Sequence, residues 1–214
     1  MHHTLNQFNA VNCRIIAYLR RQDHWYESAW KQWGIKMKEY TNIKEFYQGK
    51  RIIWLDNLHQ WSELFGKENI IIHPYEKMQL PDGLIPDFLR IIDIDYSADD
   101  WVEPPKTNRN ENIGFSRDVV EILRLNRGMI INRHDNRLFD FFSEYLGDES
   151  KKAPYQSYSF LNPKQRLEIL QMYEDMNRTI AREFLGRSDG KLFYEPWPDP
   201  DLSLIHISEP TRTY

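Results

Sequence analysis

Two arginines and a serine lie where an apolar segment passes into a helical pattern. In the stretch YLRRQDHWYES, residues 18–28, Arg20 and Arg21 follow the apolar run, and Ser28 comes eight positions after Arg20. A guanidinium can hold a phosphate through paired donors, and a hydroxyl adds one more hydrogen bond. The residue types and their spacing therefore indicate an anion site. The alternative interpretation is that the arginines only solvate a surface loop and that Ser28 is an ordinary polar position of a helix.

A strand and the helix after it must position these residues. Residues 13–19 are apolar and rich in β-branched side chains, which is typical of a buried parallel strand. Asp23 can cap a helix that runs to Trp33, and Gly34 can end it. Ligands of open parallel sheets bind beyond the carboxyl ends of the strands, and the start of a helix favours anions. Arg20 is expected at such an end, with Ser28 about one turn into the helix.

The rest of the chain predicts one more strand and several helices. Residues 69–73, NIIIH, form a second buried-strand pattern that Pro74 is expected to stop. Residues 96–112 are expected to form a polar loop. Apolar spacing, caps and terminal glycines predict helices over residues 52–65, 84–91, 116–127, 135–146 and 163–185.

This order of elements defines the expected fold class. Strand, helix, helix, strand, helix is the order of an α/β protein, and the later part of the chain is mainly helical. We therefore expect a parallel sheet with helices on both faces and a helical C-terminal part, in a single domain over residues 1–201.

Composition excludes several classes of protein. The 214-residue chain has a net charge of −4, which argues against nucleic-acid binding, since phosphate backbones require a basic face. Its single cysteine, Cys13, can form neither an internal disulfide nor a zinc knuckle. No apolar run reaches the length of a membrane span, and the first residues lack a signal-peptide core. We therefore expect a cytoplasmic protein without a membrane span.

The end of the chain has an unusual sequence. Residues 202–212, LSLIHISEPTR, resemble the in-frame translation of a transposase adapter used to prepare sequencing libraries. Residues 202–214 are therefore expected to be a non-native tail, and they are excluded from the predicted domain.

Three segments of the chain together resemble bacterial sulfotransferases that use PAPS (3′-phosphoadenosine 5′-phosphosulfate), many of them associated with surface polysaccharides. In the 3′-phosphate motif of that family an arginine closes a strand and a serine follows eight residues later, as Arg20 and Ser28 do. Residues 68–78 are similar to a later strand of the family, which ends in Tyr-Glu and leads to the segment DFL, here residues 87–89. Residues 162–186 are similar to its closing helix.

The resemblance implies a P-loop NTPase-like fold of three layers and PAPS as a co-substrate whose 3′-phosphate is bound by Arg20 and Ser28. Tyr75 is a further candidate for binding the co-substrate, at its adenine, and the alternative is that Tyr75 packs beneath the sheet. The activity it implies is transfer of a sulfuryl group to a hydroxyl of a glycan or other small acceptor. Such a transfer proceeds in line, without a metal, and depends on positioning and charge stabilisation.

The chain departs from the family at the donor loop. Neither the loop Lys-Thr-Gly-Thr-Thr nor a GxxxxGK sequence occurs in it. In the family the catalytic base, a histidine or glutamate, lies between that loop and the Arg–Ser motif. We therefore expect that Met1 is an internal start, that the first strand, donor loop and base are missing, and that the chain is inactive in transfer. No catalytic residue is assigned.

Two other functions remain open from the sequence: a non-catalytic interaction or glycan-binding module with tryptophan-rich helices, and a glycosyltransferase-related protein of polysaccharide biosynthesis. Trp25 and Trp33 lie eight positions apart on one helical face, which favours packing in the core. The sequence DID at residues 93–95 follows a predicted helix, a poor place for a sugar-nucleotide motif. His73 is expected to be a hydrogen-bonded structural histidine, and the alternative is that it points into the site. Glu76 and Lys77 are expected to be a surface pair or helix-start charges.

Overall fold

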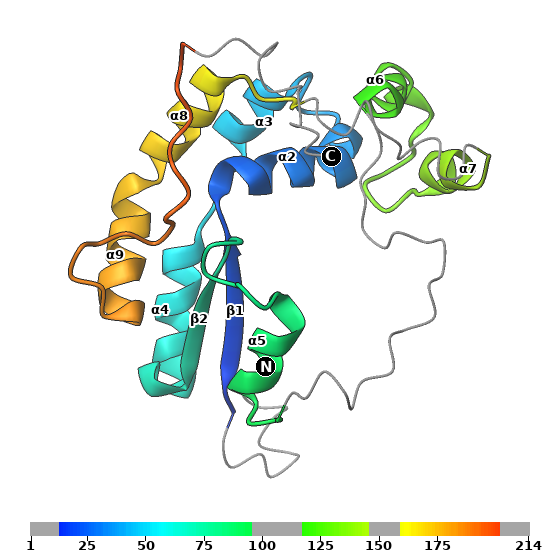
Figure 1. Ribbon diagram of the computed structural model, residues 1–214. Helices are drawn as coiled ribbons and strands as arrows, with labels where there is room; N and C mark the ends of the chain where they lie inside the picture. Colours follow the sequence, from blue (N-terminus) through cyan, green and yellow to red (C-terminus); the bar gives the residue numbers. More distant parts are fainter. Residues whose placement is uncertain (1–12, 96–116, 146–158, 202–214) are drawn as a thin grey trace, which may run out of the picture. The chain divides into compact units, whose positions relative to one another are not determined.

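The computed structural model describes residues 13–95, 117–145 and 159–201 (Figure 1). The chain divides into two compact units. The first unit comprises the described parts of residues 1–22, 52–96 and 170–196, and the second those of residues 23–51, 97–169 and 197–214.

A parallel pair of strands forms the centre of the first unit. β1 (Ile15–Arg20) and β2 (Ile70–Tyr75) pair in register from Ile15 opposite Ile70 to Arg20 opposite Tyr75. The strand expected over residues 13–19 is confirmed. The second strand was expected to stop at Pro74, which is wrong, because β2 continues to Tyr75. Within the described residues β2 pairs on one side only, and a strand with one open edge can place the missing N–H of a proline there.

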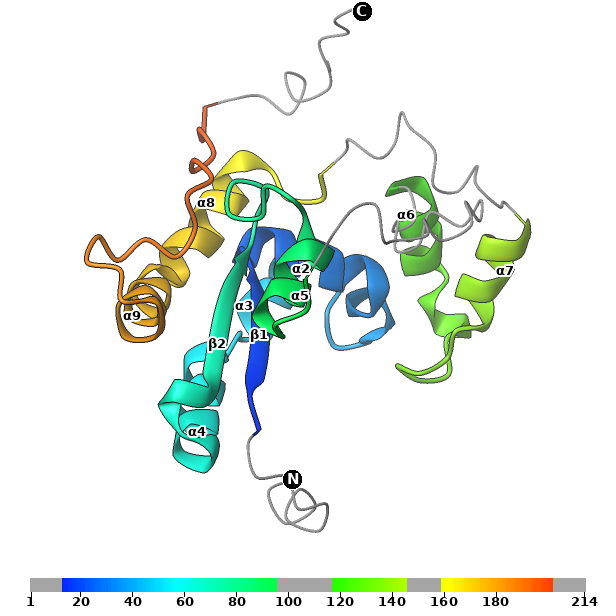
Figure 2. The same ribbon diagram turned by 60° about the horizontal axis from the view of Figure 1, so that its bottom comes forward.

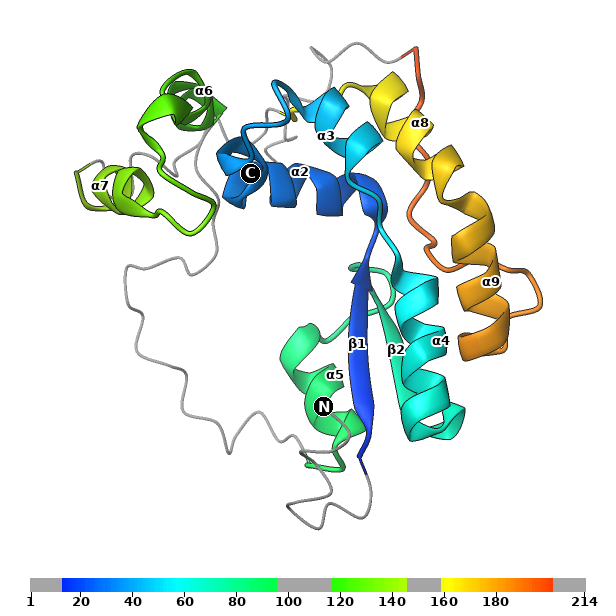
Figure 3. The ribbon, with the colours of Figure 1, turned by 180° about the vertical axis from the view of Figure 1, so that it is seen from behind.

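Helices lie on both faces of this sheet. α4 (Trp54–Phe65) and α9 (Glu174–Leu185) pack on one face, and α5 (Leu84–Ile91) lies on the other (Figures 1, 2 and 3). Alternate strand residues face α4 and α9 because side chains of a strand point to opposite faces in turn. The buried cluster between the sheet and these two helices consists of Leu19, Leu58, Ile70, Ile72, Ile180, Ala181 and Leu192.

The helices expected at residues 52–65 and 84–91 are both present. α4 begins two residues later than expected and ends before Gly66, whose φ of 85° suits glycine and whose N–H donates to the carbonyl of Ser62. α5 has the predicted bounds. A short 3₁₀ helix, Lys67–Asn69, leads from α4 into β2.

The helical stretch after Asn162 is interrupted, whereas a continuous helix was expected. α8 (Pro163–Met172) and α9 are separated at Tyr173, which has φ −109° and ψ 7°. The Tyr173 hydroxyl accepts a hydrogen bond from the Ile52 N–H at 3.1 Å, and this tertiary contact stabilises the break. The predicted start is confirmed, because Asn162 and Gln165 each accept a hydrogen bond from the other's backbone N–H at 2.9 and 3.0 Å, which forms a capping box.

The second unit is helical and has an aromatic core. Its elements are α2 (Gln22–Gln32), which starts in the first unit, the 3₁₀ helix Gly34–Lys36, α3 (Ile43–Gly49), α6 (Arg117–Leu125), the 3₁₀ helix Arg127–Met129, α7 (Arg137–Tyr145) and the first turns of α8. Tyr26, Trp30, Phe46 and Tyr47 are almost completely buried. Trp25 and Trp33 meet edge to face with ring centroids 5.9 Å apart, which confirms their expected packing role.

One helix of the second unit, α3, was not predicted, whereas two others, α6 and α7, were. α3 was not predicted, although Asn42 caps it by accepting a hydrogen bond from the Glu45 N–H at 3.0 Å, a signal that the sequence carried. The helices expected at residues 116–127 and 135–146 are present as α6 and α7 with slightly shorter bounds. The expected cap at Ser116 and the loop at residues 96–112 lie outside the described residues.

Candidate functional site

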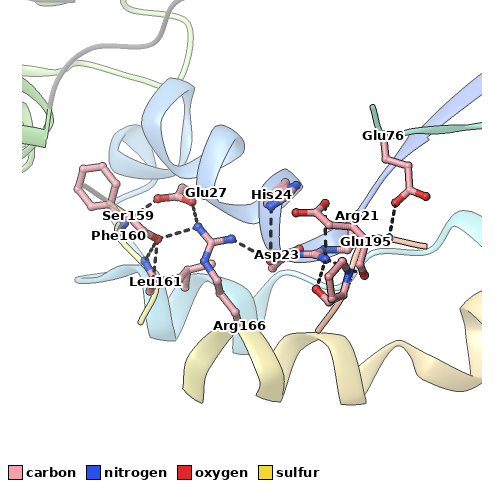
Figure 4. A network of polar contacts seen from close by, with 11 residues as sticks. Arg21, Asp23, His24, Glu27, Glu76, Ser159, Phe160, Leu161, Arg166 and Glu195 are labelled. Atoms are coloured by element: carbon pink, nitrogen blue, oxygen red, sulfur yellow. Dashed lines mark hydrogen bonds and ion pairs between the residues drawn. The ribbon is translucent and has the colours of Figure 1, made fainter. Parts of the chain in front are cut away.

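The two neighbouring arginines at the end of β1 have different environments. Arg21 is 4% exposed, and its Nη1 donates to the carbonyl oxygens of Glu195 at 3.3 Å and Pro196 at 3.1 Å (Figure 4). The same nitrogen lies 3.5 Å from the Glu195 carboxylate. Arg20 is exposed, and its side chain has no hydrogen bond or ion pair with any residue in the described part of the chain. Arg21 therefore has a structural role, while the donors of Arg20 are open to a ligand.

A buried carboxylate fixes the segment that Arg21 binds. Glu76 is 8% exposed and accepts hydrogen bonds from the backbone N–H groups of Tyr194 at 2.7 Å and Glu195 at 3.1 Å. The Gln79 side-chain amide donates to it at 2.6 Å. The expectation that Glu76 is a surface charge is wrong, because residues far along the chain cover it. Glu76 and Arg21 thus hold the same segment from two sides.

The residue after Arg21 is also held within the first unit. Gln22 is fully buried, and its side-chain amide exchanges two hydrogen bonds with that of Asn177 on α9. A paired amide satisfies both the donor and the acceptor of each side chain, so burial costs little. Arg21 and Gln22 together give the chain a defined course immediately after Arg20.

Two of the three predicted site residues lie together. Arg20 and Tyr75 are register partners at the carboxyl ends of the two parallel strands, and the Tyr75 side chain is 43% exposed. Ser28 belongs to the second unit, where it is half-buried and lies nearly two turns into α2, rather than about one turn.

Within the second unit, α2 carries a buried ionic network. Arg166 of α8 donates to Asp23 at 2.8 Å and to the Ser159 hydroxyl at 2.7 Å, and it also bonds to Glu27 (Figure 4). Asp23 is fully buried and Glu27 is 9% exposed. Asp23 lies inside the first turn of α2, which begins two residues earlier than its expected role as a cap would require.

The two carboxylates of this network keep Arg166 in its charged form. Burial alone would lower the pKa of Arg166, but the attraction of Glu27 and Asp23 outweighs it and raises that pKa above its usual value. The guanidinium therefore stays charged, and it compensates the negative charges of two buried carboxylates. The backbone N–H of Phe160 donates to Glu27 at 2.6 Å and completes the contacts.

A second polar cluster lies on the α5 face of the sheet. The Tyr18 hydroxyl donates to Asp87 Oδ2 at 2.5 Å, and His73 Nδ1 lies 2.9 Å from the same oxygen. Tyr18 and His73 are register partners whose ring centroids are 5.6 Å apart. Burial and the bond to Asp87 raise the pKa of Tyr18 well above its usual value, so the phenol stays protonated and remains a donor.

This cluster includes residues that sequence reasoning missed. His73 is at hydrogen-bond distance from a partner, as expected, but that partner, Asp87, and Tyr18 were not anticipated as its neighbours. The usable signal was the alternation of the two strands, which places Tyr18 and His73 on one face if the strands pair in parallel. The same pattern could not predict Asp87 as the partner, because the position of Asp87 depends on how α5 packs on the sheet.

The structure thus defines a mixed α/β protein that presents an exposed arginine and an exposed tyrosine at the carboxyl ends of two parallel strands. Neither a family model nor a solved structure matches the chain. It is 25% identical over 174 residues to an uncharacterized protein of Archaeoglobus fulgidus, a match that covers 81% of this chain and 46% of that protein. The chain therefore spans about half the length of this relative.

Two absences within the described residues concern membrane-spanning helices and metal ligands. No described helix has both the length and the apolar character needed to cross a membrane. In the same residues, no three histidine, cysteine, aspartate or glutamate side chains gather as metal ligands would.

A matched pair of substitutions tests the different environments of the two arginines. We expect Arg21→Ala to lower the free energy of unfolding by about 1–3 kcal/mol, because it removes charge-assisted hydrogen bonds to two carbonyl groups. Arg20→Ala, its neighbour, should change that free energy by less than about 0.5 kcal/mol. Urea denaturation followed by circular dichroism measures both, and equal losses would contradict the assignment of a structural role to Arg21 alone.

Proposed function

We propose that this chain carries the 3′-phosphate-binding end of the donor site of a PAPS-dependent sulfotransferase with a P-loop NTPase-like fold. The observation that supports this most is the exposed Arg20 at the carboxyl end of a parallel strand, without a partner in the described part of the chain. The eight-residue spacing from Arg20 to Ser28 supports the same family.

The chemistry of these residues suits a nucleotide with a 3′-phosphate. The Arg20 guanidinium can donate two parallel hydrogen bonds to phosphate oxygens, and its environment leaves those donors free. The exposed ring of Tyr75, on the neighbouring strand, offers a flat surface to a purine. In our proposal Ser28 is a further phosphate-binding residue, an assignment that rests on the sequence motif.

The reaction proposed for the complete enzyme is transfer of the sulfuryl group of PAPS to a hydroxyl of a glycan or other small acceptor. A base removes the hydroxyl proton, the oxygen attacks sulfur, and the sulfur–oxygen bond to the leaving nucleotide breaks. No residue of this chain is assigned as that base. The function proposed for the chain itself is therefore binding of the donor and of the product PAP (adenosine 3′,5′-bisphosphate), without transfer.

Calorimetry with PAP tests this proposal. We expect the parent chain to bind PAP, and Arg20→Ala to weaken the affinity by about 10- to 100-fold, the equivalent of one charge-assisted contact. Arg14→Ala is the matched control, because Arg14 is also exposed and pairs only with Asp93 at 3.4 Å among the described residues. Adenosine 5′-phosphate, which lacks the 3′-phosphate, should bind weakly and equally to all three proteins.

The result of the calorimetry with PAP distinguishes a donor-binding protein from a non-catalytic interaction module. Large apolar side chains are exposed in the second unit, which favours such a module: Leu125, Ile131, Phe141 and Tyr145. The tryptophans of residues 25–33 do not support it, since Trp30 is 1% exposed and Trp25 and Trp33 pack against each other. An interaction module predicts no binding of PAP by any of the variants, and that result would overturn the proposed function.

A further inference from the structure

His73 is oriented by a buried carboxylate. Asp87 on α5 is 8% exposed, and its Oδ2 lies 2.9 Å from His73 Nδ1 and accepts the Tyr18 hydroxyl at 2.5 Å. An ionised carboxylate only accepts hydrogen bonds, so a neutral His73 must carry its proton on Nδ1. The other ring nitrogen, Nε2, then bears a lone pair and acts as an acceptor.

The free nitrogen of His73 belongs to a partly exposed side chain. The His73 side chain is 31% exposed, and no residue in the described part of the chain bonds to Nε2. Tyr18, packed beside it on β1, directs its own hydroxyl to Asp87 and cannot supply a donor to Nε2. The fold therefore presents a hydrogen-bond acceptor of defined tautomer on the face of the sheet that carries α5.

This acceptor lies close to the proposed phosphate contact. His73 pairs with Tyr18, which is two residues before Arg20 on β1. Two steps along a strand and one step across the sheet correspond to about 8 Å between the Cα atoms of His73 and Arg20. Tyr18 and Arg20, like His73 and Tyr75, are two residues apart and so share a face of the sheet. A nucleoside 3′-phosphate is large enough to reach from one group to the other.

We propose that His73 Nε2 accepts a hydrogen bond from the exocyclic amine of a 6-aminopurine whose phosphate is held by Arg20. The inference rests on the proposed function and adds the base selectivity of the same site. A 6-oxopurine presents a carbonyl oxygen in place of the amine, so two acceptors would face each other. A site built around a fixed polar group rejects such an analogue because the group is left without a partner.

Two bisphosphates that differ only at position 6 of the purine test this selectivity. We expect the parent chain to bind PAP about tenfold more tightly than inosine 3′,5′-bisphosphate, the equivalent of one net hydrogen bond. His73→Ala should bind both ligands equally and should keep its dependence on Arg20. His59→Ala is the matched control, because His59 also pairs with a carboxylate, Glu183, at 2.9 Å, but lies on α4.

The tautomer provides a readout that does not depend on the ligand. Long-range ¹⁵N–¹H correlation spectra of the parent chain should show His73 as the Nδ1–H tautomer at a pH where it is neutral. His59 should show the Nε2–H form, because its Nε2 contacts Glu183. Asp87→Asn should change the pattern of His73 alone. An Nε2–H tautomer at His73 in the parent chain would overturn the inference, even if the His73 variant failed to fold.

The failure of the inference and that of the proposed function give different results. Equal affinities of the parent chain for the two bisphosphates would overturn the selectivity of His73 while the proposed function stands. If the parent chain bound neither bisphosphate, both the selectivity of His73 and the proposed function would be overturned.

Discussion

Replacing Arg166 by methionine is expected to lower the free energy of unfolding by about 3–5 kcal/mol, the largest effect anticipated for a single side chain of this protein. Methionine keeps much of the volume of arginine but removes its charge and its donors. Asp23, which is fully buried, and Glu27, at 9% exposure, would then be left without their cation. A buried carboxylate without a partner costs far more than a lost surface contact, because water cannot replace the missing charge.

The matched control for this substitution is Arg178→Met. Arg178 also bonds to two carboxylates, those of Glu174 at 2.8 Å and Asp175 at 2.9 Å, but all three side chains are largely exposed on α9. Its loss should cost less than about 1 kcal/mol, since water screens the ion pairs. Chemical denaturation followed by circular dichroism and tryptophan fluorescence measures both variants.

A further variant shows whether charge causes the effect. In the triple substitution Arg166→Met, Asp23→Asn, Glu27→Gln, the two carboxylates become neutral amides of nearly the same shape. We expect it to recover a large part of the stability lost in Arg166→Met, because neutral amides are less costly to bury than unpaired charges. A loss of less than 1 kcal/mol in the single variant would contradict the structural role of this network.

Glu76→Ala is expected to have the second-largest effect, a loss of about 3 kcal/mol in the free energy of unfolding. The substitution leaves the backbone N–H groups of Tyr194 and Glu195 and the amide of Gln79 without their shared acceptor. Bonds to a charged group in a buried place are among the stronger hydrogen bonds of proteins, so several lost together are costly. Glu63→Ala on α4 is the control, because Glu63 is exposed.

Coupling between Glu76 and Arg21 tests the geometry directly. Both residues hold residues 194–196, through the backbone N–H groups and the carbonyl groups, respectively. Once one of them has released that segment, removing the other should cost less. A double-mutant cycle should therefore show a combined loss smaller than the sum of the single losses by more than about 0.5 kcal/mol. Strict additivity would mean that the two side chains hold the segment independently.

The sequence by itself determined the location of several elements of this protein and of one candidate site. Apolar runs, caps and glycines located β1, α4, α5 and the start of α8, because these signals act over a few neighbouring residues. The same local signals placed Arg20 at a strand end and Tyr75 at another. They failed at Pro74 and at Tyr173, where pairing on one edge and a distant hydrogen bond decide the backbone geometry.

Only the tertiary structure decided which residues of the site are free and which are structural. Arg20 and Arg21 are neighbours of the same type, and their local sequence does not show which of the two is buried. The difference arises because carbonyl groups more than 170 residues away in the sequence surround Arg21 and leave Arg20 exposed. Tyr18, His73 and Asp87 also come together only in the folded chain, because the packing of α5 brings the Asp87 carboxylate to two strand side chains. Burial and hydrogen bonding across such distances depend on the folded chain as a whole, and local patterns do not encode them.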